Sequence, residues 1–289
     1  MQRFTPQIIA LTTSLLLSES ALAEPNGQHH YRFQQDVSTS ISGKSTIQIQ
    51  ENSDLVKSVQ PPIDSSAEQP ASSEEEIYLP GPVKRIIIDP GHGGTNEGAV
   101  GIAGIHEKYL TLSIAMFLAD RLRKTMPDVE VILTRQRDVN MSLYERIDIA
   151  NRLQADVFIS LHYNSSGNPE AIGFESFWAG DYWKKDLEKA NIDIDEQTLE
   201  RRTRTAKLGE RMAKCFNRSM RHYFDVLDRG VKEGDYTVLT RAEVPAVVLE
   251  MAFLTHAQEG LDVTKTTTRA KIINALVEAV VRYASDEVL

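Results

Sequence analysis

The sequence predicts an α/β fold, in which one domain has a twisted, mainly parallel sheet of about six strands with helices on both faces. Short aliphatic runs, such as Ile86-Ile87-Ile88, alternate along the chain with longer amphipathic segments. That alternation is typical of parallel sheets, whose crossovers are helical. The first run also ends abruptly, at Asp89-Pro90-Gly91. Hydrophobic residues make up 41% of the 289 residues, which is enough for one globular core.

Residues 1–23 have the pattern of a cleavable signal peptide. Arg3 precedes a short apolar stretch that ends in Ala21-Leu22-Ala23, as in a secretory signal with its small-residue cleavage site. The stretch is short and interrupted by serine and threonine, which disfavours a membrane span. We expect export to the periplasm, cleavage after Ala23 and no transmembrane anchor in the processed protein. The alternatives are a retained anchor helix and, for location, an extracellular or wall-associated protein.

Residues 24–80 are predicted to be a disordered, acidic linker. They are rich in serine, proline and glutamine, and nine acidic residues against three basic ones give them a net charge of −6. Too few apolar residues are present to offset the entropy of ordering them. The whole chain carries a net charge of −9, which excludes nucleic acid as a partner because phosphate binding needs a basic surface. Residues 81–289 then form the globular domain.

The first half of that domain reads as three strands and two helices. We predict strands at 83–88, 129–133 and 157–161. Ser142-Leu143-Tyr144-Glu145 is the pattern of a capping box, and it predicts a helix that runs to about residue 154. A helix between the first two strands ends at Pro127-Asp128. Its predicted inner face, from spacings of three and four, consists of Tyr109, Leu112, Ala115, Met116, Ala119 and Leu122.

The second half adds further strands and a closing helix. We predict strands at 172–178, 236–239 and 246–249, with a long charged helical region over about 181–224. The closing helix has Ile272, Ile273, Leu276, Val277, Val280 and Val281 on its inner face. The only cysteine is Cys215, so no internal disulfide forms. It shares a helical stripe with Leu208, Met212 and Phe216, which predicts a buried core side chain.

Four candidate site residues stand at predicted strand ends and at a helix start. His92 follows the first strand, His162 the third and Glu250 the last, while Glu107 opens the first helix. Residues at the carboxyl ends of parallel strands gather at one edge of the sheet, where ligands usually bind. Two imidazoles and one carboxylate are a common catalytic zinc set, and a further glutamate is then free to transfer protons.

Spacing alone leaves alternatives open for each of these residues. A histidine is often a surface or capping residue, so a structural role is the alternative for His92 and His162. Glu107 also fits a charge that favours the N-terminal end of a helix dipole, and its neighbour His106 is a competing ligand. Glu250 follows Val247-Val248-Leu249, and an acid at the end of an apolar strand needs a partner.

Ordered sequence blocks carry a family resemblance over roughly residues 83–284. The blocks are Ile88-Asp89-Pro90-Gly91-His92-Gly93-Gly94, Gly98-Ala99-Val100-Gly101, Glu107-Lys108, Leu133-Thr134-Arg135, Ser142-Leu143-Tyr144-Glu145-Arg146, Ala150-Asn151, Ile159-Ser160-Leu161-His162-Tyr163-Asn164, Gly230-Val231-Lys232 and Val244-Pro245-Ala246-Val247-Val248-Leu249-Glu250-Met251-Ala252-Phe253-Leu254. In this order they closely resemble the zinc-dependent N-acetylmuramoyl-L-alanine amidases of bacterial cell-wall remodelling.

The resemblance implies a role for each candidate residue. His92, Glu107 and His162 match the three ligands of one Zn²⁺, which favours Glu107 over His106, and Glu250 matches the catalytic glutamate. The implied substrate is peptidoglycan. The implied reaction is hydrolysis of the amide between the lactyl group of N-acetylmuramic acid and L-alanine of the stem peptide, with Glu250 as base and then acid. Manganese or cobalt is the alternative metal, although this ligand set suits zinc.

The segment 181–204 has two interpretations. Thirteen of its 24 residues are charged, which is typical of a solvated excursion. Some cell-division amidases carry an insert here that covers the zinc until an activator protein binds, so the resemblance also implies that Glu188, Glu196 or Glu200 could fill the open metal position. Two other functions remain open for the chain as a whole, a zinc peptidase of the stem peptide and a non-catalytic cell-wall-binding protein.

Overall fold

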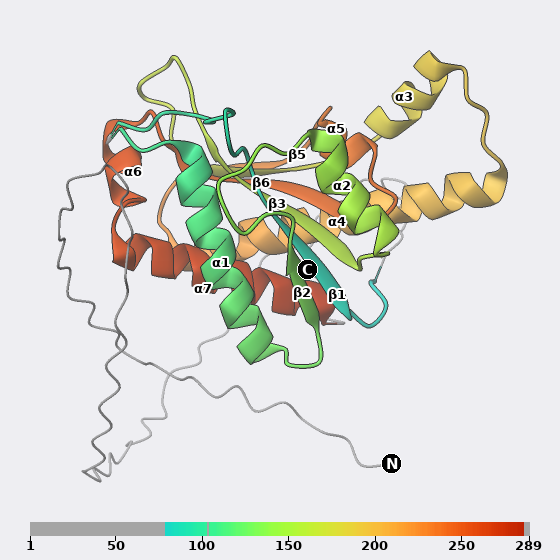
Figure 1. Cartoon of the computed structure of the whole chain (residues 1–289), viewed down its shortest axis with the longest axis horizontal. Coiled ribbons are helices and arrows are strands. Elements are labelled where there is room, and N and C mark those ends of the chain that lie inside the picture. Colours follow the sequence, from blue (N-terminus) through green and yellow to red (C-terminus); the bar gives the residue numbers. More distant parts are fainter. Residues whose placement is uncertain (1–78, 103, 286–289) are drawn as a thin grey trace, which may run out of the picture. The chain divides into compact units, whose positions relative to one another are not determined.

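One six-stranded mixed sheet forms the centre of the computed structural model, which describes residues 79–102 and 104–285 (Figure 1). The strand order is β2-β1-β3-β6-β4-β5. All neighbouring strands are parallel except β4 and β6, which are antiparallel. The strands are β1 (Arg85–Pro90), β2 (Glu130–Leu133), β3 (Val157–Asn164), β4 (Phe174–Trp178), β5 (Asp228–Glu233) and β6 (Ala246–Phe253). The predicted fold class is therefore confirmed.

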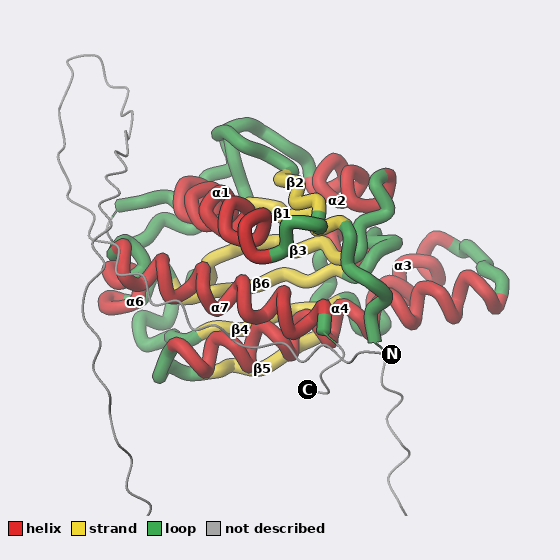
Figure 2. The backbone as a smooth tube through the Cα atoms, turned by 90° about the horizontal axis from the view of Figure 1, so that it is seen from below, coloured by secondary structure: helices red, strands yellow, loops and turns green. Residues whose placement is uncertain are grey.

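Helices cover both faces of the sheet. On one face, α1, α4 and α7 lie along the strands (Figure 2) and share a core with Ile86 and Ile88 of β1. On the other face, Ile87 belongs to a second core that includes residues of α2 and α5 and Trp183 near the start of α3, because successive side chains of a strand point to opposite faces. The helices are α1 (Glu107–Thr125), α2 (Leu143–Arg152), α3 (Tyr182–Ala190), α4 (Glu196–Tyr223), α5 (Thr237–Thr240), α6 (Ala257–Asp262) and α7 (Thr266–Ala284).

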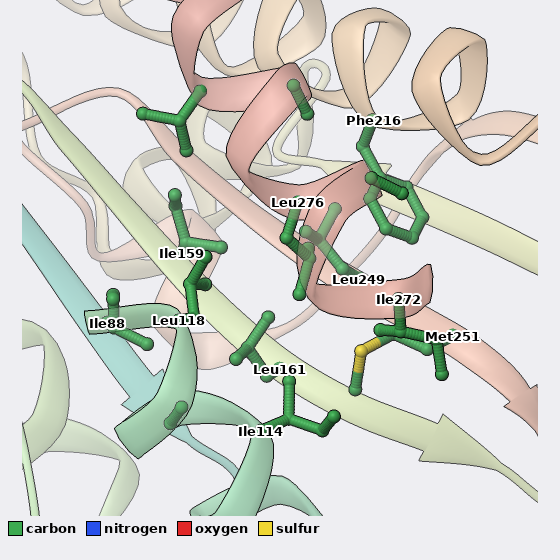
Figure 3. Close-up of a cluster of buried hydrophobic side chains, with 14 of the residues drawn as sticks. Ile88, Ile114, Leu118, Ile159, Leu161, Phe216, Leu249, Met251, Ile272 and Leu276 are labelled. Carbon is green, nitrogen blue, oxygen red and sulfur yellow. The ribbon is translucent and has the colours of Figure 1, made fainter. Parts of the chain in front are cut away.

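The larger core lies between the sheet and the three long helices α1, α4 and α7 (Figure 3). It joins Ile159, Leu161 and Leu249 of the strands to helix residues that include Ile114 and Phe216. Full burial of each such side chain contributes about 1.5–3 kcal/mol to the free energy of unfolding. This core fixes the sheet on which the candidate site is built.

Cys215 is buried in the same core, as predicted, and the core also contains Met212 and Phe216 from the predicted helical stripe. Burial raises the pKa of the Cys215 thiol to about 11. The thiol therefore stays protonated at neutral pH and packs as a small apolar side chain.

The capping box and the helix after it are confirmed. The Ser142 hydroxyl accepts from the backbone N–H of Glu145, and the Glu145 carboxylate accepts from the N–H of Ser142. The helix that this box opens is α2, which ends at Arg152 rather than at residue 154.

The predicted inner face of α1 is partly wrong. Tyr109 and Met116 are 50% and 51% exposed, and the buried stripe runs instead through Leu110, Ile114 and Leu118. The helix is apolar over much of its circumference, so two stripes satisfy the same spacing rule. The aliphatic stripe is the one that packs against the sheet.

Three element predictions need correction. Residues 236–239 are not a strand, because α5 begins at Thr237. The edge strand β5 was not predicted, since its sequence Asp-Arg-Gly-Val-Lys-Glu carries four charges and one glycine and so lacks a strand pattern. The charged helical region is two helices, α3 and α4, separated where Asn191 adopts a left-handed backbone with φ 53°.

Three strands end later than predicted, and the first of them is β1, which ends at Pro90 instead of residue 88. β3 continues through His162 to Asn164, and β6 continues through Glu250 to Phe253. These two candidate residues therefore lie within strands rather than after them. No helix among the described residues has the length and hydropathy of a membrane span. The predicted signal peptide, and all of the predicted linker except residues 79 and 80, lie outside the described residues.

Candidate metal centre

The structure brings the four candidate site residues together at one edge of the sheet. His92 lies in the turn after β1, and Glu107 is the first residue of α1. His162 on β3 and Glu250 on β6 are Cα partners in the parallel ladder. These elements are far apart in the chain, and the sheet order β1-β3-β6 makes them neighbours.

His92, Glu107 and His162 form a compact group of metal-binding atoms. His92 Nε2 lies 3.0 Å from Glu107 Oε2, and His162 Nδ1 lies 3.0 Å from Glu107 Oε1. One ligand atom from each residue lies within 4.8 Å of the other two, and this is the only such group of three or more among the described residues. Zinc–ligand bonds of about 2.1 Å place tetrahedral ligands about 3.4 Å apart, so the group fits zinc.

The charge state of Glu107 depends on its burial and on its hydrogen bonds. Burial disfavours the charged form of Glu107, but hydrogen bonds from His162 and His92 outweigh it and hold the pKa of Glu107 well below its usual value. Backbone N–H groups of Ala99 and Tyr163 also donate to the same carboxylate, each at 2.9 Å. Glu107 is therefore an ionised, 2% exposed carboxylate with both oxygens held in place.

The competing ligand His106 does not join the group. Its Nδ1 lies 3.2 Å from Glu97 Oε1, and its ring lies near Tyr109. His106 is the residue before the first turn of α1, whereas Glu107 begins that turn. The one-residue difference points the two side chains in different directions, and only Glu107 reaches the two imidazoles.

The turn that carries His92 is fixed by contacts that sequence reasoning missed. His92 has a left-handed backbone with φ 60°, and its carbonyl accepts a hydrogen bond from Arg146. Asn96 Oδ1 lies 2.8 Å from His92 Nδ1. Asn96 Oδ1 is an acceptor that also receives the Gly98 N–H, so the Nδ1–H of His92 donates to it and the plane of the ring is fixed.

Beneath this turn lies a buried ionic network centred on Asp89. Arg146 Nη1 lies 2.8 Å from Asp89 Oδ1, and both side chains are at most 3% exposed. The hydroxyls of Thr134 and Ser160 donate to the same carboxylate at 2.6 and 2.8 Å. Arg135 donates to the carbonyls of Pro90 and Gly91. The only sequence signal for this network is a charged residue inside an otherwise buried strand.

Gly91 allows the imidazole of His162 to lie directly against the backbone of the turn. A Cβ at position 91 would stand 2.2 Å from His162 Cε1 and 2.4 Å from its Nε2. No ring and methyl group can approach so closely, so only glycine leaves the imidazole in its present place.

Glu250 lies beside the group but outside its ligand set. Burial raises the pKa of Glu250 to about 7, opposed mainly by the positive field of His162 and reinforced by the charges of Glu107 and Glu175. Its Oε2 has no hydrogen-bond partner among the described residues. A carboxyl group with this pKa exchanges protons readily near neutral pH, as a general base and acid does.

A cavity of about 500 Å³ joins Glu250 to the ligand group. Its lining includes Met141, Leu143, Asn164 and Tyr236. Among the described residues, those that line it include none from 181–204. The cavity is large enough for a substrate segment next to the metal-binding atoms.

Comparison with known proteins identifies the family. The family model for N-acetylmuramoyl-L-alanine amidase matches residues 86–282, a range that contains His92, Glu107, His162 and Glu250. The chain belongs to the N-acetylmuramoyl-L-alanine amidase family. It is 28% identical to the N-acetylmuramoyl-L-alanine amidase AmiA of Escherichia coli over 219 residues, which cover 68% of this chain and 75% of AmiA. It is 30% identical to the uncharacterised protein YqiI of Bacillus subtilis, over 69% of this chain and 84% of YqiI.

Solved structures of amidases in this family share the fold. The catalytic domain of CwlV, an N-acetylmuramoyl-L-alanine amidase from Bacillus (Paenibacillus) polymyxa var. colistinus, superposes with a TM-score of 0.57 at 27% identity and covers 69% of this chain and 97% of that domain. An N-acetylmuramoyl-L-alanine amidase from Clostridium difficile 630 superposes with a TM-score of 0.57 at 27% identity. The match covers 70% of this chain and 97% of the Clostridium difficile chain.

Proposed function

We propose that this protein is a zinc-dependent N-acetylmuramoyl-L-alanine amidase. It hydrolyses the amide between the lactyl group of N-acetylmuramic acid and L-alanine of the stem peptide in peptidoglycan. The observation that carries the proposal is the group formed by His92, Glu107 and His162, with Glu250 beside it in one cavity. Membership of the amidase family supports the choice of bond.

Each residue has a specific part in the proposed mechanism. His92, Glu107 and His162 would hold the metal ion, and the bound ion would supply Lewis-acid chemistry at the scissile carbonyl and a lowered pKa for water. Glu250 accepts a proton from the attacking water and passes it to the departing nitrogen of L-alanine, which is otherwise a poor leaving group. Asn96 keeps the His92 ring in the orientation that binds metal.

The processing and location of the protein form a second part of the proposal. Residues 1–23 direct export and are removed, and residues 24–80 give the domain 81–289 reach toward the wall in the periplasm. Mass spectrometry of the mature protein tests this, because an intact Met1 would contradict cleavage. An extracellular or wall-associated location is the second choice.

The role of the segment 181–204 stays a prediction. If it restrains the site until an activator protein binds, deletion of residues 182–202 will raise the rate of hydrolysis by the isolated protein. An unchanged rate in a folded deletion variant would support the solvated excursion instead. The segment does not line the cavity in this structure, so a blocked form would require α3 to move.

Digestion of purified murein tests the proposed function directly. With zinc, the protein should release intact stem peptides and leave glycan strands without peptide, and a chelator should stop the release. A peptidase would instead shorten peptides that stay attached to the glycan. Binding to murein without any release, with or without zinc, would contradict catalysis altogether. Metal analysis of the same preparation checks for about one ion per chain.

A further inference from the structure

A second charged cluster lies beside Glu250, on β4 and β5, the two strands after β6 in the order of the sheet. It consists of Glu175, Arg229 and Lys232. Glu175 on β4 is the cross-strand partner of Glu250, so both carboxylates lie on the same face of the sheet. Glu175 is 5% exposed and has three partners. Asn164 donates to its Oε1, and Lys232 and Arg229 donate to its Oε2.

The cluster carries an excess of positive charge. Lys232 and Arg229 on β5 share one carboxylate, which leaves a net charge of +1 in a chain whose own net charge is −9. Their side chains are 40% and 32% exposed, so part of each side chain faces solvent. Each is also held against an aromatic ring, Arg229 over Phe253 at 4.9 Å and Lys232 over Phe177 at 5.8 Å.

The cluster adjoins the metal-site cavity through two residues that line it. Asn164, which bonds to the buried carboxylate, lines that cavity, and so does Tyr236, whose ring packs edge-on against Phe177 at 5.2 Å. The cationic cluster therefore lies next to residues that face the space open to a substrate.

We propose that Arg229 and Lys232 bind a carboxylate of the peptide part of the substrate, so that the protein prefers acidic stem peptides. This inference rests on the proposed amidase function. The strand β5 lies two strand spacings, about 10 Å, from Glu250 on β6, and about three extended residues span that distance. The carboxylate therefore belongs to one of the first residues after the scissile bond. Guanidinium and ammonium groups form charge-assisted hydrogen bonds with such a group.

A pair of matched substrates tests the inference with the full chain and zinc. One is a soluble N-acetylmuramoyl peptide whose peptide carboxylates are free, and the other is the same compound with those carboxylates amidated. We expect kcat/KM for the acidic peptide to exceed that for the amidated one by about tenfold, the range expected for a hydrogen bond to a charged group. Added salt should reduce this ratio, because half-exposed charges are screened.

Four variants separate binding from structural support. Lys232→Gln and Arg229→Gln should each bring the ratio close to one, whereas Lys232→Arg should keep most of it. Lys271→Gln removes the same charge from the exposed side of α7, on the other face of the sheet, and should leave the ratio unchanged.

Equal rates for the two peptides in the unmodified protein would overturn the inference and leave the amidase function intact. An equal loss on both peptides in Lys232→Gln would also overturn it. Cleavage of neither peptide would overturn the amidase function as well.

Discussion

The metal-site edge of the sheet and the helical projection formed by α3 and the start of α4 use charged residues in opposite ways. At the sheet edge, Asp89, Glu107 and Arg146 are at most 3% exposed and each has several partners. In the projection, which extends away from the sheet (Figure 1), a typical pair is Asp181 with Lys184, whose side chains are 68% and 37% exposed. The comparison teaches that charge density in the sequence does not locate the site, whereas the cluster of buried, mutually paired charges at the sheet edge does.

The largest expected difference concerns two glutamates. Glu250→Gln should keep the metal and reduce hydrolysis by about 10³-fold or more, because it removes the group that transfers the proton. Glu188→Gln in α3 is the matched change in the projection and should not lower hydrolysis. Turnover of murein and zinc content are measured together. A Glu250→Gln variant with near-normal turnover would exclude Glu250 as the base.

The next difference concerns two aspartates in ion pairs. Asp89→Asn leaves Arg146 buried without its counter-charge and should lower the free energy of unfolding by about 3–5 kcal/mol. Asp181→Asn breaks an exposed pair and should cost less than about 1 kcal/mol. Urea unfolding of both variants checks this. Similar losses would mean that the two regions do not differ in the way described.

A smaller effect is expected on metal affinity. Asn96→Ala removes the acceptor that holds the His92 ring and should weaken zinc binding by about 10–100-fold. The fold should be retained, since the Asn96 side chain is not part of the core. Competition with a chromophoric chelator measures the affinity. Asn274→Ala on α7, where the amide contacts Arg121, is the control and should bind zinc normally.

The smallest effect concerns the pH dependence of stability. Burial acts against the charged form of Asp138, but the Gly94 N–H and Lys108 more than compensate and lower its pKa. A carboxyl with a lowered folded-state pKa stabilises the fold above its unfolded pKa of about 3.9 and loses this as the pH falls through the folded-state value. Asp138→Asn should therefore be less stable than the unmodified protein at pH 6, and the difference should shrink as the pH falls below about 3.9.

Urea unfolding at several pH values between 3 and 6 measures that difference. Asp193→Asn, in the exposed link between α3 and α4, is the matched control and should show little difference at any pH. A constant gap between Asp138→Asn and the unmodified protein down to pH 3 would assign the loss to packing instead of charge.

Local signals predicted much of the fold and the composition of the candidate site. Runs such as Ile86-Ile87-Ile88 and the Ser142 capping box depend only on neighbouring residues, so they can be recognised in one sequence. The position of His92 after the first strand followed from the same runs, whereas His162, expected at the end of a strand, lies within β3. The choice of Glu107 over His106 did not follow from these runs, since a one-residue difference in direction depends on how α1 begins.

The remaining features depend on contacts between distant segments. The link from Asp89 to Arg146 joins β1 to α2, and no spacing rule connects them. The cluster on Glu175 depends on β5, whose charged sequence does not resemble a strand. Tyr109 and Met116 were misplaced because only the sheet decides which apolar stripe of α1 it accepts.

The position of β5 at the end of the sheet also affects how copies of this protein behave at high concentration. A terminal strand presents backbone groups that can pair with a strand of another molecule, and charged side chains discourage such pairing. Asp228, Arg229, Lys232 and Glu233 place four charges on this six-residue strand. Neutral substitutions there therefore carry a risk of aggregation, and light scattering should accompany any assay of Lys232→Gln or Arg229→Gln.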